Sequence, residues 1–194
     1  MKIQKKIILP GIILLINLIS FSGISQNSYI KNRISIKSGY GRILDPYNFE
    51  YDKTSYFQIA GLYGLLDWLE TGIYTGYSSI ETMYLNPSSS FTMREVKATN
   101  NLSYGISVNF HLLPFLIEDK DFRFDFYLTG KLGGTYLLND EYYRPEKGHR
   151  TEYGGGIGAA FYPGKHWGIY GEYSLGNYFY EDNDRLLGGI ILKF

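Results

Sequence analysis

The sequence predicts an all-β protein built from long antiparallel strands. Three observations predict this class. Segments of ten or more residues alternate between apolar and polar side chains, a period of two residues that is typical of β-strands. The chain is rich in the residues that fit such strands and their bends, with 20 Tyr, 12 Phe and 23 Gly. Beyond residue 25, no apolar run is long enough to form a transmembrane helix.

Residues 122–137 carry the clearest pattern, because apolar side chains fall on one face of the expected strand and polar ones on the other. The apolar face holds Phe122, Phe124, Phe126, Leu128, Leu132 and Tyr136, and the polar face holds Arg123, Asp125, Tyr127, Thr129, Lys131 and Thr135. A strand of this length exceeds the usual size of about 5–6 residues and is long enough to cross a bilayer obliquely. In a membrane barrel the apolar face contacts lipid and the charged face lines the lumen.

The amino terminus has the three regions of a secretory signal peptide. Met1–Lys6 is basic, residues 7–21 are apolar, and Gly23 and Ser25 supply the small residues before a cleavage site. We therefore expect two parts, a signal peptide at 1–25 and a single β-barrel domain at 26–194.

Composition excludes several classes of protein. The sequence has no cysteine, which excludes disulfides, thiolate metal sites, cysteine nucleophiles and a lipid-anchored cysteine. Without Lys2, Lys5 and Lys6, the 19 basic residues fall to 16 against 19 acidic ones, a net charge of about −3. This balance gives no reason to expect binding to nucleic acid.

Eight strands follow in order, separated by turns and loops. The expected strands are 33–41, 55–65, 68–84, 91–112, 122–137, 151–162, 167–179 and 185–194. The second is the least regular, because its outward set of Phe57, Ile59, Tyr63 and Leu65 leaves Leu62 inside. The fourth is the most regular, with an inner face of Asn101, Ser103, Gly105, Ser107, Asn109 and His111. An inner face of polar residues and glycine is typical of a membrane barrel and not of a dry soluble core.

The connections differ in length in a way that orients the barrel. The second, fourth and sixth are short, at 66–67, 113–120 and 163–166, whereas the first, at 45–52, is long and the segment 139–150 forms a long polar loop. Residues 181–184 are expected to turn the chain into the last strand. The third and fourth strands continue past the others as a projecting hairpin at about 78–99. Outer-membrane barrels place short turns in the periplasm and longer loops outside, with aromatic girdles at both interfaces.

The last strand ends on an aromatic residue, with Ile190, Leu192 and Phe194 on one face. This ending resembles the carboxyl-terminal assembly signal of outer-membrane proteins. The whole chain after residue 25 resembles the small eight-stranded barrels of the OmpX and OmpA transmembrane-domain type. The resemblance implies insertion into the outer membrane of a Gram-negative bacterium by the barrel-assembly machinery, and it supplies no catalytic motif.

Eight ionisable side chains are expected to point into the lumen: Arg33, Lys37, Glu70, Arg123, Asp125, Lys131, Glu172 and Lys193. Lys37 and Glu172 lie at similar depth, while Arg33, Glu70, Arg123, Asp125 and Lys193 lie nearer the short turns. An eight-stranded barrel is just wide enough for side chains to fill it. The sequence therefore predicts a plug of paired charges, with an ion or proton path as the alternative.

Other chemistry finds little support in the sequence. His111, His149 and His166 fall on an inner wall, an outer loop and a periplasmic turn, so they are not expected to share a metal ion. Ser107 lies about 13 Å along the strand from His111, too far for a catalytic hydrogen bond. The glycines at 154–158 lack the lysine and helix of a phosphate-binding loop and are read as a strand. No cofactor is expected.

The predicted function is an integral outer-membrane barrel with a structural or surface-interaction role. The candidate site for a partner is the hairpin at 78–99, with Tyr84, Phe91 and Met93. Outer-membrane lipids and lipopolysaccharide are the other expected partners, and the barrel is expected to be a monomer. Two alternatives remain open. One is an enzyme that modifies lipid A, although the His-x-Ser motif of barrel-shaped lipid A deacylases does not occur here. The other is a soluble periplasmic barrel that binds a ligand in an apolar interior.

Overall fold

The structure is a computed structural model that describes residues 30–44, 53–85, 94–116, 123–139, 149–178 and 181–194. The expected signal peptide at 1–25 and the loop at 45–52 lie outside the described residues. Within them are eight strands and one short helix: β1 Ile34–Leu44, β2 Lys53–Leu66, β3 Leu69–Leu85, β4 Arg94–His111, α2 Leu113–Leu116, β5 Phe124–Asn139, β6 His149–Phe161, β7 Trp167–Tyr178 and β8 Glu181–Lys193.

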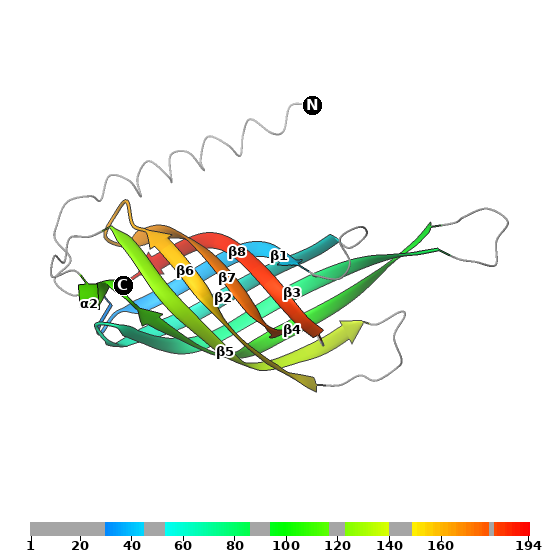
Figure 1. Cartoon of the computed structure of the whole chain (residues 1–194), viewed down its shortest axis with the longest axis horizontal. Coiled ribbons are helices and arrows are strands. Elements are labelled where there is room, and N and C mark those ends of the chain that lie inside the picture. The colour runs from blue at the N-terminus through cyan, green and yellow to red at the C-terminus, as the bar shows by residue number, and fades with distance from the viewer. Residues whose placement is uncertain (1–29, 45–52, 86–93, 117–122, 140–148, 179–180) are drawn as a thin grey trace, which may run out of the picture.

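The eight strands form one closed antiparallel barrel in sequence order (Figure 1). Each strand pairs with the next along the chain, and β1 pairs with β8 to complete the ring, from Ser35 opposite Lys193 to Leu44 opposite Asp184. The predicted fold class is therefore confirmed. None of the helices described is long and apolar enough to serve as a membrane span.

The barrel is apolar outside and polar inside, as the alternation of the strands requires. The outward rows of large apolar side chains are exposed, for example Ile73 at 70%, while the residues between them are buried. The irregular second strand follows the same rule, since Leu62 points inward at 2% exposure and Tyr63 points outward. A register shift between Gly64 and Leu66 marks an irregularity at the end of β2.

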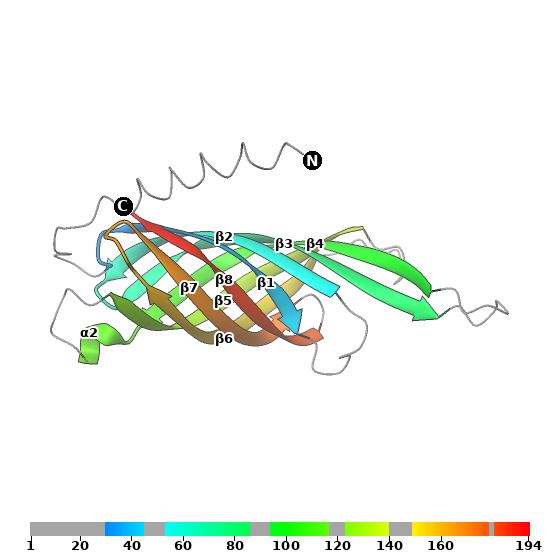
Figure 2. The ribbon, with the colours of Figure 1, turned by 90° about the horizontal axis from the view of Figure 1, so that it is seen from above.

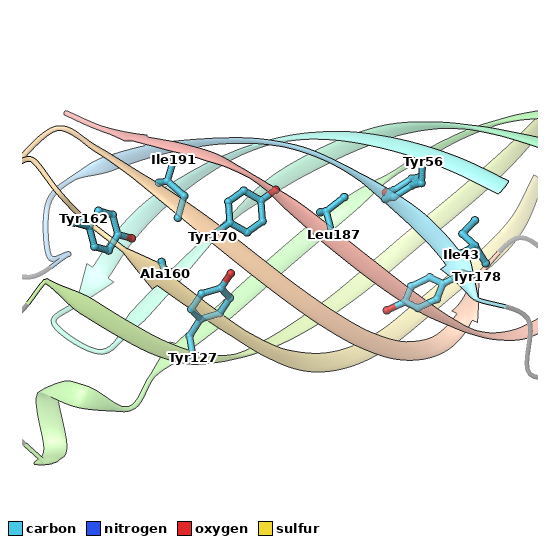
Figure 3. Packing of buried hydrophobic residues seen from close by; sticks show 9 residues of the cluster. All are labelled: Ile43, Tyr56, Tyr127, Ala160, Tyr162, Tyr170, Tyr178, Leu187 and Ile191. Carbon is cyan, nitrogen blue, oxygen red and sulfur yellow. The ribbon is translucent and has the colours of Figure 1, made fainter. Parts of the chain in front are cut away.

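Five of the nine residues in the buried hydrophobic cluster inside the barrel are tyrosines. Figure 3 shows them with a few aliphatic side chains in the interior, arranged along the barrel: Ile43, Tyr56, Tyr127, Ala160, Tyr162, Tyr170, Tyr178, Leu187 and Ile191. A tyrosine ring fills volume while its hydroxyl still reaches a polar partner. The interior is consequently a mixture of rings and charges and not an oily core.

The two ends of the barrel differ. The carboxyl terminus and α2 lie at one end (Figure 1), whereas β3 and β4 extend past the other strands at the opposite end, as Figure 2 also shows. The β3–β4 register runs from Leu69 opposite Phe110 out to Leu85 opposite Arg94, so the predicted projecting hairpin is present in the backbone.

Several predicted boundaries are wrong. Residues 181–184, expected as a turn, belong to β8, where Glu181 already pairs with Tyr178. Asn139, His149 and Arg150, expected in a loop, lie in β5 and β6. The expected turn at 113–120 contains α2. In β5, β6 and β8 the ladder extends into polar residues, which a count of apolar positions assigns to loops.

Candidate functional site

The lumen contains most of the buried charge of the described chain. Its buried ionisable side chains comprise four bases and four acids together with His111: Lys37, Lys131, Arg185, Lys193, Glu70, Asp125, Glu152 and Glu172. They come from β1, β3, β4, β5, β6, β7 and β8, and they form three clusters at successive depths. Burial of this many charges is tolerated only when they are paired and hydrogen-bonded.

The His111 cluster lies at the end with the short turns. The two ring nitrogens of His111 reach different carboxylates, with Nδ1 2.8 Å from Asp125 Oδ2 and Nε2 3.2 Å from Glu70 Oε2. The Ser35 hydroxyl donates to the other Glu70 oxygen at 2.6 Å. Lys193 lies nearby over the ring of Tyr162, 4.1 Å from its centroid. The cluster joins β1, β3, β4 and β5.

The Glu172 cluster lies in the middle of the barrel. Glu172 binds two lysines, Lys131 through Oε1 and Lys37 through Oε2, the second at 3.4 Å. The Tyr127 hydroxyl accepts a hydrogen bond from Lys37 at 2.8 Å and donates to Glu172 at 3.4 Å. Lys131 also donates to Gln58 Oε1 at 3.2 Å. One carboxylate thus holds two bases from opposite sides of the lumen.

The Arg185 cluster lies toward the projecting hairpin. Arg185 pairs with Glu152 at 3.1 Å, and the guanidinium carbon lies 3.4 Å from the centroid of Tyr178 and 4.8 Å from that of Tyr56. The Thr135 hydroxyl donates to the second Glu152 oxygen at 2.6 Å. A guanidinium between two rings gains cation–π attraction in addition to its ion pair. The cluster joins β2, β5, β6, β7 and β8.

Most of the predicted lumen residues point inward, but two do not fit. Lys37, Glu70, Asp125, Lys131, Glu172 and Lys193 are buried in the lumen. Arg123 directly precedes β5, and its carbonyl accepts a hydrogen bond from the Tyr162 N–H at 2.7 Å. Its side chain is exposed, so its placement in the buried lumen network is wrong. Arg33 is half-buried just before β1 at the mouth of the barrel.

Sequence reasoning missed two members of the network and the role of a third. The predicted set omits Arg185, which directly follows the expected turn at 181–184, and Glu152, which precedes a run of glycines. His111 was correctly placed on an inner wall, but its contacts with Glu70 and Asp125 depend on the registers of three strands. The outward row of Ile190, Leu192 and Phe194, continued back at a period of two residues, reaches position 186. The residue before it, Arg185, then falls on the inward face, which is the signal that identifies it.

The three histidines lie apart from one another. His111 is in the lumen, and His166 is in the β6–β7 turn with its Nδ1 3.1 Å from the Lys193 carbonyl oxygen. His149 is exposed on the outer face, where its Nδ1 lies 2.8 Å from the Tyr104 hydroxyl and its ring contacts Tyr136. This arrangement places no two histidines in one cluster.

The projecting hairpin has two outer edges that extend past the neighbouring strands. The β2 register on β3 ends at Glu81, and the β5 register on β4 ends at Asn100. Beyond these points residues 82–85 of β3 pair with 94–97 of β4, while 98–99 of β4 pair with 80–81 of β3. Of the candidate residues, Phe91 and Met93 lie outside the described residues, and Tyr84 is described only as backbone in β3.

Comparison with known proteins identifies the fold. No protein-family model matches the sequence, and no curated protein matches it. Among solved structures, the amino-terminal barrel of Pseudomonas aeruginosa OprF matches with a TM-score of 0.55 and 13% identity, over 85% of this chain and 99% of that one. OprG from the same organism matches with a TM-score of 0.54 and 9% identity, over 86% of this chain and 98% of OprG. Ail of Yersinia pestis matches with a TM-score of 0.50 and 14% identity, over 85% of this chain and 100% of Ail.

These matches agree with the distribution of side chains in the barrel. A closed barrel with exposed apolar rows and paired charges inside is stable when lipid surrounds it. Proteins of this construction lie in the outer membrane of Gram-negative bacteria. The chain has the fold of the small eight-stranded outer-membrane β-barrels.

Proposed function

We propose that this outer-membrane barrel has a structural or surface-interaction role, with a lumen closed by paired side chains and a partner-binding site on the β3–β4 hairpin. The observation that carries the proposal is the extension of β3 and β4 beyond the registers of β2 and β5. It gives an otherwise closed barrel two strand edges outside the ring. The role proposed is not enzymatic.

The burial and pairing of the interior support a closed lumen. Glu172, Lys131 and His111 each have an exposed fraction of 6% or less, and every one of them contacts an oppositely charged or hydrogen-bonding group. An ion that crosses the barrel has to break these contacts and displace tyrosine rings. Side chains of an eight-stranded barrel commonly fill it in this way.

Conductance tests the plug directly. The purified monomer, inserted in a planar bilayer, is expected to give no steady ion current, while a large porin in the same bilayer serves as the positive control. Steady single-channel current from the folded monomer would overturn the closed lumen and favour the alternative of an ion path.

The geometry of the hairpin supports the binding of an extended segment. A strand edge presents backbone N–H and C=O groups that another chain can pair with, adding one strand to the sheet. The β4 edge at 94–99 is longer than the β3 edge at 82–85, so it offers more of these groups. A related fold, that of Ail, belongs to a protein named for attachment and invasion. The partner proposed is therefore a surface protein that supplies an extended segment.

Deletion of residues 84–92 tests the hairpin. Cells carrying this variant are expected to lose adhesion to the surfaces that the parent cells bind, while the variant still folds and reaches the outer membrane. A deletion of 141–147, in the β5–β6 connection, is the matched control and is expected to retain adhesion. Equal adhesion by the two deletion variants would contradict the proposal.

The two alternative functions, a soluble ligand-binding barrel and a lipid-A enzyme, each require a structural feature that can be compared with this barrel. A soluble ligand-binding barrel needs an apolar interior, whereas this interior contains four acids and four bases and the apolar rows face outward. A lipid-A enzyme needs a convergent set of catalytic groups on the lipid face. Mass spectrometry of lipid A from cells with and without the protein tests the enzymatic alternative. We expect the same acylation pattern in both, and an altered pattern would replace our proposal with an enzymatic one.

Biogenesis involves a further proposed partner. Ile190 and Phe194 are exposed on the outer face of β8 and its end, at 54% and 66%, with Leu192 half-buried between them. This row fits recognition by the barrel-assembly machinery. Lipopolysaccharide and phospholipid are the proposed partners of the remaining outer surface, and the monomer is the proposed assembly state.

A further inference from the structure

The short helix α2 follows β4 and lies at the end of the barrel opposite the projecting hairpin (Figure 2). Outer-membrane barrels place the end with the short turns in the periplasm, so we take this end as the periplasmic rim. Its first residue, Leu113, is buried, while Phe115 and Leu116 are exposed at 59% and 75%. Leu116 is the most exposed large apolar side chain in the described part of the chain. The helix therefore holds one apolar side chain inward and presents two outward.

Aromatic contacts connect α2 to the outer face of the barrel. The Phe115 ring stacks on Phe110 with centroids 5.5 Å apart and an interplanar angle of 8°. Trp68, from the β2–β3 turn, contacts both rings, at 5.1 Å from Phe110 and 5.9 Å from Phe115. Phe110 is the last outward residue of β4, so these contacts make the surface of α2 continuous with the apolar outside of the barrel.

We propose that Phe115 and Leu116 of α2, together with Trp68, form an anchor that inserts into the periplasmic leaflet and binds phospholipid at the boundary between head groups and acyl chains. This proposal rests on membrane insertion of the barrel and adds a lipid-binding surface outside the strands. Scattered apolar residues on a surface carry no such meaning, but an apolar patch that extends an existing lipid-facing surface does.

The residue types of α2 and Trp68 fit the boundary between head groups and acyl chains. Tryptophan prefers the interface, where its ring is buried and its N–H stays hydrated, and it is accompanied here by two exposed and purely apolar side chains, Phe115 and Leu116. Two backbone hydrogen bonds fix the start of the helix on the barrel: the Phe115 N–H donates to the Leu112 carbonyl at 3.2 Å, and the Leu112 N–H donates to the Phe126 carbonyl at 2.8 Å.

The consequence is a fixed depth for the periplasmic end. A strand barrel can shift along the membrane normal until its apolar rows fit the bilayer, but a rim anchor on one side limits that movement. Since α2 follows β4 directly, the anchor acts on the same strand pair that forms the projecting hairpin at the opposite end.

Depth-dependent fluorescence quenching tests the anchor on the full chain. Replacing the two native tryptophans by Trp68→Phe and Trp167→Phe and adding Leu116→Trp leaves one probe on α2. In vesicles, we expect its emission to shift to the blue and to be quenched more by phospholipids brominated near the head group than by those brominated near the chain end. Phe115→Trp provides a second probe on the same surface if the first variant does not fold.

Two controls separate the anchor from membrane insertion itself. Leu132→Trp, on the outer face of β5, is expected to be quenched best by bromines deep in the bilayer, and Lys31→Trp, exposed before β1, by aqueous iodide. If the probe on α2 behaves like the one at residue 31 while the one at residue 132 is quenched by lipid, the anchor is overturned and the membrane barrel stands. Absence of lipid quenching at residue 132 would overturn both.

Discussion

Glycine and tyrosine act as partners inside this barrel. A Cβ atom at any of five lumen-facing glycines would collide with the ring or hydroxyl of a tyrosine from another strand. The pairs are Gly39 with Tyr170, Gly76 with Tyr56, Gly154 with Tyr178, Gly158 with Tyr127 and Gly168 with Tyr162. At these five positions glycine and tyrosine are complementary, since each large ring needs a position without a side chain opposite it.

Gly158→Ala tests this complementarity. The added methyl group has to displace the Tyr127 ring, which holds Lys37 and Glu172, so we expect a loss of about 1–3 kcal/mol in the free energy of unfolding. Gly171→Ala is the matched control, because nothing lies within 4 Å of its Cβ position on the outer face. That change is expected to stay within about 0.5 kcal/mol. Urea unfolding in lipid vesicles, followed by tryptophan fluorescence, measures both, and equal losses would contradict the prediction.

Glu172→Gln tests the ion pairs at the centre of the lumen. The substitution leaves Lys37 and Lys131 buried without their shared carboxylate, and breaking a buried pair in this way costs about 3–5 kcal/mol. We expect a lower urea midpoint and a weaker resistance to denaturation by detergent. Asp67→Asn, an exposed acid in the β2–β3 turn, provides the control and is expected to change stability by less than about 1 kcal/mol, because water screens the interactions of an exposed charge. An unchanged midpoint for the lumen variant would show that the pairing adds little.

At the scale of the element, alternation of side chains was enough to predict the strands but not their ends. The period of two residues set the inward and outward faces of all eight strands, including Leu62 inside β2. The ends were missed where the ladder continues through polar residues, as at Glu181 and His149. Helix α2 was missed because four residues are too few for a helical period, and Pro114 within it is typical of a turn.

Ile106→Arg tests which face of β4 contacts lipid. Ile106 is exposed and pairs with Ile73 and Leu132 near the middle of the outward apolar rows. A charge there is expected to lower the free energy of unfolding in a bilayer by about 2–4 kcal/mol, whereas Thr151→Arg, near the outer end of β6, is expected to cost about 0–1 kcal/mol. Equal effects at the two positions would mean that this face is not in a membrane.

At the scale of the whole molecule, the order of the strands was predictable and the contacts across the lumen were not. Counting residues from the short turns placed Lys37 near Glu172, which the structure pairs at 3.4 Å. The contact of His111 with both Glu70 and Asp125 depends on how far each strand is shifted against its neighbours. Alternation along one strand contains no information about that shift, since only the packing of all eight strands sets it.

The closed barrel predicts an unusual behaviour in gel electrophoresis. Because every strand is paired on both sides within the ring, detergent has no open edge from which to unfold the sheet, so unheated protein should stay folded in dodecyl sulfate. We expect the unheated sample to migrate faster than the boiled one. Identical migration of the two samples would contradict a closed barrel, and the same experiment on cells extracted with Sarkosyl reports the location.

The first and last strands meet at the two ends of the barrel sequence. The Ile34 N–H donates to the Phe194 carbonyl at 3.1 Å, and the Phe194 N–H donates to the Ile34 carbonyl at 2.9 Å. The ring therefore closes only once β8 is in place, and a chain without β8 leaves the outer edges of β1 and β7 unpaired. Because unpaired edges can join with strands of other chains, closure of the ring also protects this sheet from aggregation.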